Sequence, residues 1–162
     1  MTERINRQWR LASRPEGLIK KSDFEWLEET VRPLEEGEIL ARNIYLSLDP
    51  ANRGWVNTGP SYVEPVGIGE VMRGLTIGVV EESRNDQFSV GDIVSGTIGW
   101  QDYGISDGRD LRTVDSGQLP LTAFLGLFGM VGMTAYFGLL DIGKPKAGET
   151  LVVSGAAGAV GS

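Results

Sequence analysis

Alternating apolar and polar residues near the N-terminus predict a pair of strands. Residues 7–32 hold two short alternating runs, and Pro15 and Gly17 lie in the turn between them. Phe24 and Trp26 fall on one face of the second run, because successive side chains of a strand point to opposite faces. We therefore expect this segment to form two paired strands.

The strongest strand pattern lies at residues 39–48 and ends at Pro50, whose ring fixes φ and removes a ladder donor. One predicted face is apolar and holds Leu40, Ile44, Leu46 and Leu48. The opposite face holds Ala41, Asn43, Tyr45 and Ser47. The alternation thus predicts a strand with two different faces.

Shorter runs studded with glycine follow, at residues 72–82, 88–94, 98–105 and 111–114. Their near-regular spacing predicts the strands of a small β-barrel. Residues 54–70 carry several glycines and prolines and are expected to form a long loop. Loops of this length are usually functional lids or mobile segments, and a plain surface excursion fits this one equally well.

The apolar spacing becomes helical after residue 119 and continues to Leu140, and Gly143 and Pro145 are expected to stop the helix. The residues at helical intervals are Met133, Tyr136, Phe137, Leu139 and Leu140. We place a domain border at this change of pattern. One domain is expected at residues 1–119, and a second segment at residues 120–162.

The last residues carry the most specific pattern. Residues 151–153 are apolar, and Gly155, Gly158 and Gly161 follow at a spacing of three. This order predicts a buried parallel strand, a tight turn and the start of a helix. Such a turn lets the main chain approach a pyrophosphate, which free backbone N–H groups then hold. The usual fingerprint is G-x-G-x-x-G, and Ala156 stands where its first glycine would be, so the motif alone is weak.

Composition narrows the possible functions. The chain of 162 residues is 41% apolar and 23% charged, which is typical of a soluble globular protein. It lacks a run of about 18 apolar residues and an apolar core at its N-terminus, so we expect neither a membrane span nor a secretory signal, and a cytoplasmic location. A net charge of −7 without a basic cluster argues against nucleic-acid binding.

The chain contains no cysteine and no histidine. It therefore lacks a thiol nucleophile, an imidazole base and the ligands of an ordinary catalytic zinc ion. It also lacks the D-x-D-x-D-G pattern of a calcium loop, so no metal site is expected. Chemistry must come from a cofactor, from tyrosine and water, or from residues outside this chain.

The order of a β-barrel, connecting helices and a glycine turn resembles the medium-chain dehydrogenase/reductase superfamily. The zinc-independent branch is most similar, with its prostaglandin and alkenal reductases, leukotriene hydroxydehydrogenases and plant double-bond reductases. The matching segments are residues 43–50, 53–54, 88–92, 100–103, 132–136 and 155–162. The resemblance implies a mainly β fold: a GroES-like, partly open β-barrel, then connecting helices and the first strand and glycine turn of a Rossmann domain.

The resemblance also implies a chemistry. In that branch a hydride passes from NADPH to the β-carbon of an α,β-unsaturated ketone or aldehyde, and the α-carbon is then protonated. The enolate oxygen needs a hydrogen-bond donor, often a tyrosine of the nucleotide-binding domain. The protein itself positions the nicotinamide against the alkene. The whole protein is expected to act on a small molecule and to form a homodimer.

Site residues follow from the same resemblance. The expected NADP(H)-binding residues are Met133, Thr134, Gly155, Ala156, Ala157, Gly158, Ala159, Val160 and Gly161, with the amides of Ala159 and Val160 nearest the phosphates. The expected substrate pocket holds Ala51, Trp100 and Tyr103. Thr134 fits helix capping nearly as well, and Trp100 and Tyr103 fit a core. Many relatives carry Pro-Tyr-Met-Arg where residues 50–53 read Pro-Ala-Asn-Arg, which puts an aromatic-substrate preference in doubt. No catalytic residue is assigned.

Three hypotheses remain open. The chain is the N-terminal portion of an NADP-dependent enone reductase, or of a quinone oxidoreductase of the same branch, or a complete non-catalytic binding module. In the first case we expect the 162-residue chain alone to be inactive and to bind NADPH weakly, because one residue past Gly161 builds no helix. Residues 151–153, without sheet neighbours, should then disorder, aggregate or pair with another copy.

Overall fold

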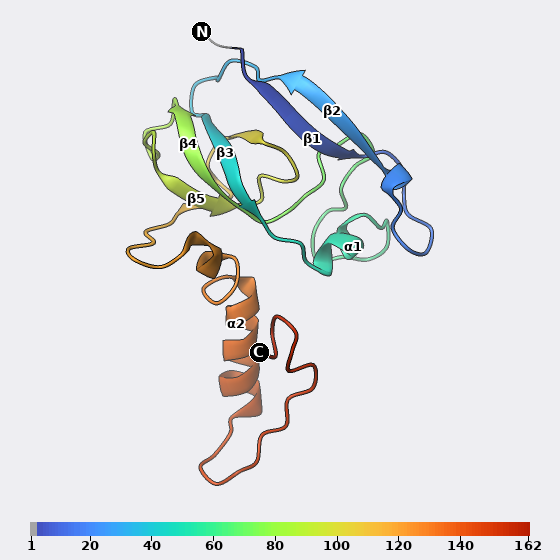
Figure 1. Cartoon of the computed structure of the whole chain (residues 1–162), viewed down its shortest axis with the longest axis vertical. Coiled ribbons are helices and arrows are strands. Elements are labelled where there is room, and N and C mark those ends of the chain that lie inside the picture. The colour runs from blue at the N-terminus through green and yellow to red at the C-terminus, as the bar shows by residue number, and fades with distance from the viewer. Residues whose placement is uncertain (1–2) are drawn as a thin grey trace. The chain divides into compact units, whose positions relative to one another are not determined.

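The structure is a computed structural model that describes residues 3–162, and the chain folds as two compact units. Unit 1 ends at Asp115, and unit 2 comprises Ser116–Ser162. Figure 1 shows the strands in the blue-to-yellow part of the chain and the longer helix in the orange part. The assignment of a substrate domain and a nucleotide-binding segment to the two units stays a prediction.

The first two strands of unit 1 form the expected antiparallel pair. Strand β1 (Ile5–Leu11) pairs with β2 (Phe24–Thr30), and the short 3-10 helix η1 (Lys21–Asp23) leads into β2. Trp9 lies directly opposite Trp26 in this register, and their rings meet edge to face with centroids 5.0 Å apart. The structure therefore confirms the strand pair predicted from residues 7–32.

A second, five-stranded antiparallel sheet has the order β6-β3-β4-β5-β7. Its strands are β3 (Ile39–Leu46), β4 (Thr76–Ser83), β5 (Ile93–Gly96), β6 (Tyr103–Ser106) and β7 (Leu111–Thr113). Single bridges join β1 to this region, one between Gln8 and Gln101 and another between Arg10 and Val71. The mainly β fold expected from the sequence is confirmed.

Two apolar clusters form the core of unit 1. The cluster within the five-stranded sheet holds Ile39, Ala41, Val80, Phe88, Val94, Ile98 and Leu111. The second cluster, which β1 and the segment after β3 build together, holds Leu11, Trp55, Val56, Val66 and Met72. Both clusters are removed from water, and this burial is the main term that stabilises the unit.

The predicted faces of residues 39–48 are wrong. Leu40 and Ala41 are both buried, whereas Ile44 and Leu46 are partly exposed. The pairing of β3 with β4 shifts at residues 40–41 and again at residues 43–45. Each irregularity in the register resets which face a side chain occupies, so strict alternation does not extend along this strand.

A short helix, α1 (Ala51–Trp55), begins directly after Pro50, where the sequence pattern indicated only the end of a strand. Asn52 is buried here, accepts a hydrogen bond from the Asp49 amide at 3.0 Å and donates one to the Arg73 carbonyl at 3.3 Å. The chain then runs as a long loop to β4. Trp55 anchors this loop through its indole N–H, which donates to the Tyr62 hydroxyl at 3.3 Å.

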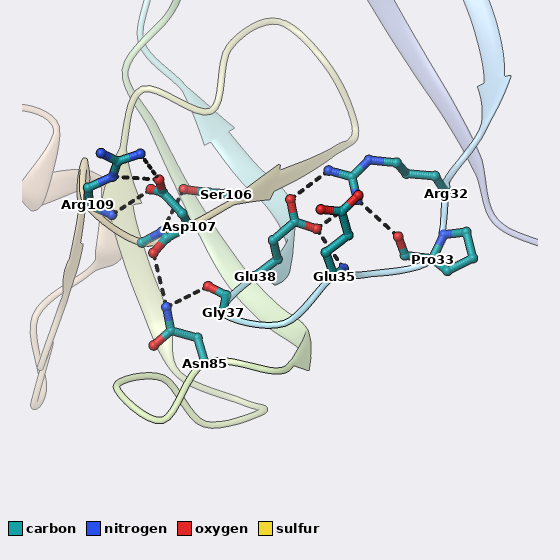
Figure 2. Close-up of polar contacts among 10 residues, drawn as sticks. Arg32, Pro33, Glu35, Gly37, Glu38, Asn85, Ser106, Asp107 and Arg109 are labelled. Atoms are coloured by element: carbon teal, nitrogen blue, oxygen red, sulfur yellow. Dashed lines mark hydrogen bonds and ion pairs between the residues drawn. The ribbon is translucent and has the colours of Figure 1, made fainter.

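Polar side chains tie three loops of unit 1 together (Figure 2). Asn85, after β4, donates to the Gly37 carbonyl at 2.9 Å and to the Asp107 carbonyl at 3.0 Å. Arg32 makes a two-pronged ion pair with Glu38, with both N···O distances at 2.7 Å. These bonds hold the connections β2–β3, β4–β5 and β6–β7 beside one another.

Unit 2 contains the 3-10 helix η2 (Leu121–Phe124), the α-helix α2 (Met130–Phe137) and the π-helical segment η3 (Gly138–Gly143). Lys144, with φ of 47°, ends the helical run at the predicted place. Every residue of this unit is at least partly exposed, and Val152 is 86% exposed. Residues 151–153 form no strand in this chain, because a strand needs a neighbour to accept its hydrogen bonds.

No helix within residues 3–162 has both the length and the apolar character that crossing a membrane requires.

Candidate functional site

The glycine turn of unit 2 is held by its own main chain. Gly155 adopts the left-handed conformation with φ of 64°, which side chains other than glycine rarely tolerate. The Gly158 amide donates to the Gly155 carbonyl at 2.7 Å, and the Ser162 amide donates to the Gly158 carbonyl at 3.0 Å. A Cβ on Gly161 would stand 2.5 Å from the Gly155 oxygen, so this position also requires glycine.

Several amides of this turn are uncommitted. Within the described part of the chain, the N–H groups of Ala156, Ala157, Ala159 and Val160 donate no hydrogen bond. These residues are exposed, and their side chains are small or apolar. Free N–H groups on a glycine-rich turn form an anion-binding concavity without any charged side chain. The turn therefore has the chemistry that a diphosphate needs.

The other expected cofactor residues, Met133 and Thr134, lie on α2 and are exposed. The Thr134 hydroxyl donates to the Met130 carbonyl one helical turn earlier, at 2.7 Å. A Cβ at Gly132 would overlap the Leu127 carbonyl oxygen, so the start of α2 packs backbone to backbone on the preceding loop. The Thr134 hydroxyl therefore bonds within its own helix, as the alternative interpretation of this residue expected. A contact of Thr134 with the cofactor stays a prediction.

Two of the three expected substrate-pocket residues come together in unit 1. Ala51 and Trp100 both pack against the cluster of Leu11, Trp55, Val56, Val66 and Met72. Trp100 also stacks on Phe24, with ring centroids 5.6 Å apart and planes 18° apart. Tyr103 lies on β6 opposite Arg42, and its backbone N–H donates to the Asn6 side chain at 2.9 Å. Their role in substrate binding stays a prediction.

A pocket of about 250 Å³ lies between β1, β2, the end of β3 and the segment before β6. Its aromatic and aliphatic walls are Trp9, Trp26, Ile44, Tyr45, Leu46 and Trp100. Its polar lining comes from Arg7, Asn43, Gln101 and Asp102, with the backbone of Gly99. Tyr103 does not line this pocket.

Sequence reasoning missed Trp9, Trp26 and Asn43 as pocket residues. The signal was present for the tryptophans, because a hairpin over residues 7–32 can bring two indoles to facing positions. Asn43 offered no such signal. Its side chain donates to the carbonyls of Gly99 and Gln101, at 3.1 and 2.7 Å, across two separate segments.

Two buried polar atoms of this region have no partner within residues 3–162. They are the Trp100 indole nitrogen and the Asn43 side-chain oxygen. A Cβ at Gly74 would stand 2.9 Å from the Trp100 nitrogen and 2.7 Å from the Leu46 methyl carbon. Only glycine at position 74 therefore lets Trp100 and Leu46 pack this closely on the segment before β4.

The charges at the pocket are neutralised locally. The Arg7 guanidinium lies 2.5 Å from the Asp102 carboxylate, and this hydrogen bond raises the pKa of Arg7. No group of three or more acidic, histidine or cysteine side chains in the described part of the chain could hold a metal ion. A ligand in this pocket would therefore contact aromatic side chains and an ion pair whose two charges neutralise each other.

Comparison with known families decides what kind of domain unit 1 is. The family described as the N-terminal domain of oxidoreductase matches residues 7–114, which is most of unit 1. The chain belongs to this family.

Comparison with individual proteins narrows the group of oxidoreductases that this domain resembles. It is 51% identical over 158 residues to the NADPH-dependent curcumin reductase of Escherichia coli, covering 97% of this chain and 46% of that protein. It is 41% identical to prostaglandin reductase 1 of Rattus norvegicus, covering 95% of this chain and 46% of the relative. The crystal structure of CurA from Vibrio vulnificus in complex with NADPH has 49% identity and a TM-score of 0.86, over 96% of this chain and 46% of that one.

These relatives confirm the resemblance inferred from the sequence. The chain is the N-terminal part of a zinc-independent medium-chain dehydrogenase/reductase, and the GroES-like fold of its β region is confirmed. The chain spans about half the length of the curated relatives it matches.

Proposed function

We propose that this chain is the N-terminal portion of an NADP-dependent oxidoreductase that reduces the carbon–carbon double bond of α,β-unsaturated ketones and aldehydes without zinc. The observation that carries the proposal is the glycine turn with four uncommitted amides, at residues 155–161, in a chain of this family. The names of its relatives, a curcumin reductase and a prostaglandin reductase, support the substrate class.

The residues present fit NADPH. The positive φ of Gly155 and the close approach at Gly161 leave a turn without side chains that would obstruct a diphosphate. The amides of Ala156, Ala157, Ala159 and Val160 would donate to the phosphate oxygens. NADPH, when bound, would supply the hydride for the reduction.

The chain's own side chains would mainly bind the substrate and keep water away from it. Without histidine or cysteine the chain has no imidazole or thiol to move a proton, so a tyrosine, water or a residue outside this portion would protonate the substrate carbon. The apolar surroundings of Ala51 and Trp100 suit an uncharged enone better than a charged substrate. For the whole protein we also propose a cytoplasmic location and a homodimer.

A chimera tests this function directly. Residues 1–162 of this chain would replace the corresponding residues of the Escherichia coli curcumin reductase, to which they are 51% identical. We expect NADPH oxidation with alkyl and aryl enones, a saturated ketone as the product and slower turnover of quinones. The unmodified Escherichia coli enzyme serves as the reference.

Two outcomes would contradict the proposal. A folded chimera that binds NADPH and reduces quinones but no enone would support a quinone oxidoreductase. A folded chimera that neither binds NADPH nor reduces any substrate would support a non-catalytic binding module.

A further inference from the structure

The pocket between β1, β2 and β3 has walls that are mostly aromatic. Trp9 and Trp26 come from the β1–β2 pair, Tyr45 and Leu46 from β3, and Trp100 from the segment before β6. Trp26 is 45% exposed, although its neighbour Trp9 and the stacked Trp100 are partly covered. Exposed aromatic side chains at a concave site indicate a ligand-binding site. Their exposure gives up the stabilisation that burial of their apolar surface would provide, and a bound ligand would supply that burial.

Hydrogen bonds join the walls to one another. The Trp9 amide donates to the Trp100 carbonyl at 2.9 Å, and the Trp100 amide donates to the Met72 carbonyl at 2.8 Å. The Asn43 amide donates to the Asp102 carbonyl at 2.8 Å, which fixes β3 to the same segment. The pocket is therefore preformed, and a ligand would not have to order it.

The lining also restricts the charge of a ligand. Arg7 and Asp102 neutralise one another at 2.5 Å, and the Gln101 side chain bonds to Asn6 at 2.9 Å and to the Ile98 carbonyl at 2.7 Å. A charged ligand would lose its hydration here without gaining an unpaired charge of opposite sign, because the two polar atoms of the lining that have no partner within residues 3–162, the Trp100 indole nitrogen and the Asn43 side-chain oxygen, belong to neutral groups. The lining therefore favours a neutral ligand.

The volume restricts its size. At about 250 Å³, the pocket is smaller than the roughly 300–1,000 Å³ typical of sites for whole drug-sized ligands. This volume matches that of one substituted ring. Aromatic rings pair best offset or edge to face, as Trp9 and Trp26 already do.

We propose that this pocket of unit 1 binds a single neutral aromatic ring. The shared chemistry is that of a phenol or of the aryl end of a larger molecule. The inference does not depend on the proposed reductase activity, since it concerns binding to the walls of unit 1 alone.

The four tryptophans provide the test, because three line the pocket and Trp55 does not. The ¹⁵N-labelled chain would be titrated with p-cresol, with the aryl enone benzylideneacetone and with cyclohexanol as a non-aromatic control. We expect saturable shifts of the indole N–H signals of Trp9, Trp26 and Trp100 with both aromatic compounds. The Trp55 signal should stay in place, and cyclohexanol should shift none of them.

Variants check the location. Trp26→Ala should weaken binding of both aromatic ligands at least fivefold, and Tyr45→Ala, on a different wall, should weaken it in the same direction if the first variant fails to fold. Tyr136→Ala removes a ring of unit 2 that is 57% exposed and should leave the affinity unchanged. Tighter binding of benzylideneacetone than of p-cresol would identify a substrate's aryl end, and equal binding a free phenolic ring.

Uniform shifts of all four indoles, equal shifts with cyclohexanol, or equal weakening by Tyr136→Ala would overturn the inference.

Discussion

Gly155 and Gly161 touch through their backbones: a Cβ on Gly161 would stand 2.5 Å from the Gly155 carbonyl oxygen and 3.0 Å from its carbonyl carbon. Gly155 itself has a φ of 64°. Each glycine is therefore required for a different reason, one for its dihedral angle and one for its contact. The turn closes on itself through the Gly158 amide, which leaves the amides of Ala156, Ala157, Ala159 and Val160 uncommitted within the described part of the chain.

Replacing Gly161 by alanine should open this turn. In the chimera with the Escherichia coli reductase, we expect Gly161→Ala to weaken NADPH binding by about tenfold or more, which corresponds to about 1.4 kcal/mol. The reason is that the backbone must move to relieve the contact with Gly155. Titration of NADPH followed by fluorescence measures the change.

Gly138→Ala provides the matched control for that variant. Gly138 lies at the end of α2 in a helical conformation, and a Cβ there would meet no atom within 4 Å. Its NADPH affinity should equal that of the unmodified chimera. If Gly161→Ala bound NADPH equally well, the close approach of the two glycines would be irrelevant to the cofactor.

The 162-residue chain on its own should bind NADPH more weakly than micromolar. The turn is exposed, has two internal hydrogen bonds and follows residues 151–153, which have no strand partner in the described structure. Ordering this segment on binding costs free energy, which offsets part of the free energy gained from hydrogen bonds to the amides. Fluorescence titration of the chain with NADPH provides the measurement, and a micromolar dissociation constant would contradict the prediction.

Local patterns predicted much of unit 1 because its strands find their neighbours within the chain. The two paired strands within residues 7–32 followed from simple alternation, whereas the register that sets Trp9 opposite Trp26 was not predicted. The faces of β3 did not, because the register shifts at residues 40–41 and 43–45 depend on how β4 pairs with it. Helix α1 was missed since its buried Asn52 is held by Arg73, a residue distant in sequence.

The candidate site was predictable only in part, for a related reason. The glycine spacing indicated the turn at residues 155–161, because φ and close contact act locally. The strand at residues 151–153 was expected from composition, yet strand formation depends on partners that an apolar run cannot supply. The place of Asn43 in the pocket depends on long-range hydrogen bonds to Gly99 and Gln101, which no local pattern reveals.

The rate of amide hydrogen exchange should differ between residues 151–153 of unit 2 and the central strands of unit 1. Amides of residues 151–153 should exchange at nearly the rate of an unstructured peptide, because no hydrogen bond within residues 3–162 holds them. Amides of β3 and β4, paired inside the five-stranded sheet, should be protected. Mass spectrometry of peptic fragments distinguishes the two. Protection of residues 151–153 in a monomeric sample would refute this prediction.

The ion pair of Glu38 should contribute stability that depends on acid pH. Two hydrogen bonds from Arg32, and a third from the Glu35 amide, lower the pKa of Glu38 from 4.5 to about 2 (Figure 2). Since the folded pKa is the lower one, the contribution is complete above pH 4.5 and is lost as the pH falls toward about 2.

Glu38→Gln tests this dependence. The melting temperature of the variant should lie below that of the unmodified chain at neutral pH, and the difference should vanish as the pH approaches about 2. The pKa of Asp107 is also lowered, by Arg109, so only the difference between variants isolates Glu38. Glu36→Gln, on the same loop, should show no such pH-dependent difference.

Truncation of Ile39 should destabilise unit 1 strongly. Ile39 is fully buried in the cluster with Val80, Phe88 and Val94, so its replacement by alanine leaves a cavity. We expect a loss of about 2–5 kcal/mol in the free energy of unfolding. All four tryptophans lie in unit 1, so urea denaturation followed by fluorescence reports its unfolding. Val90→Ala, at a residue 66% exposed, should change the free energy by less than about 0.5 kcal/mol. Equal effects of the two substitutions would show that the cluster around Ile39 does not hold the sheet together.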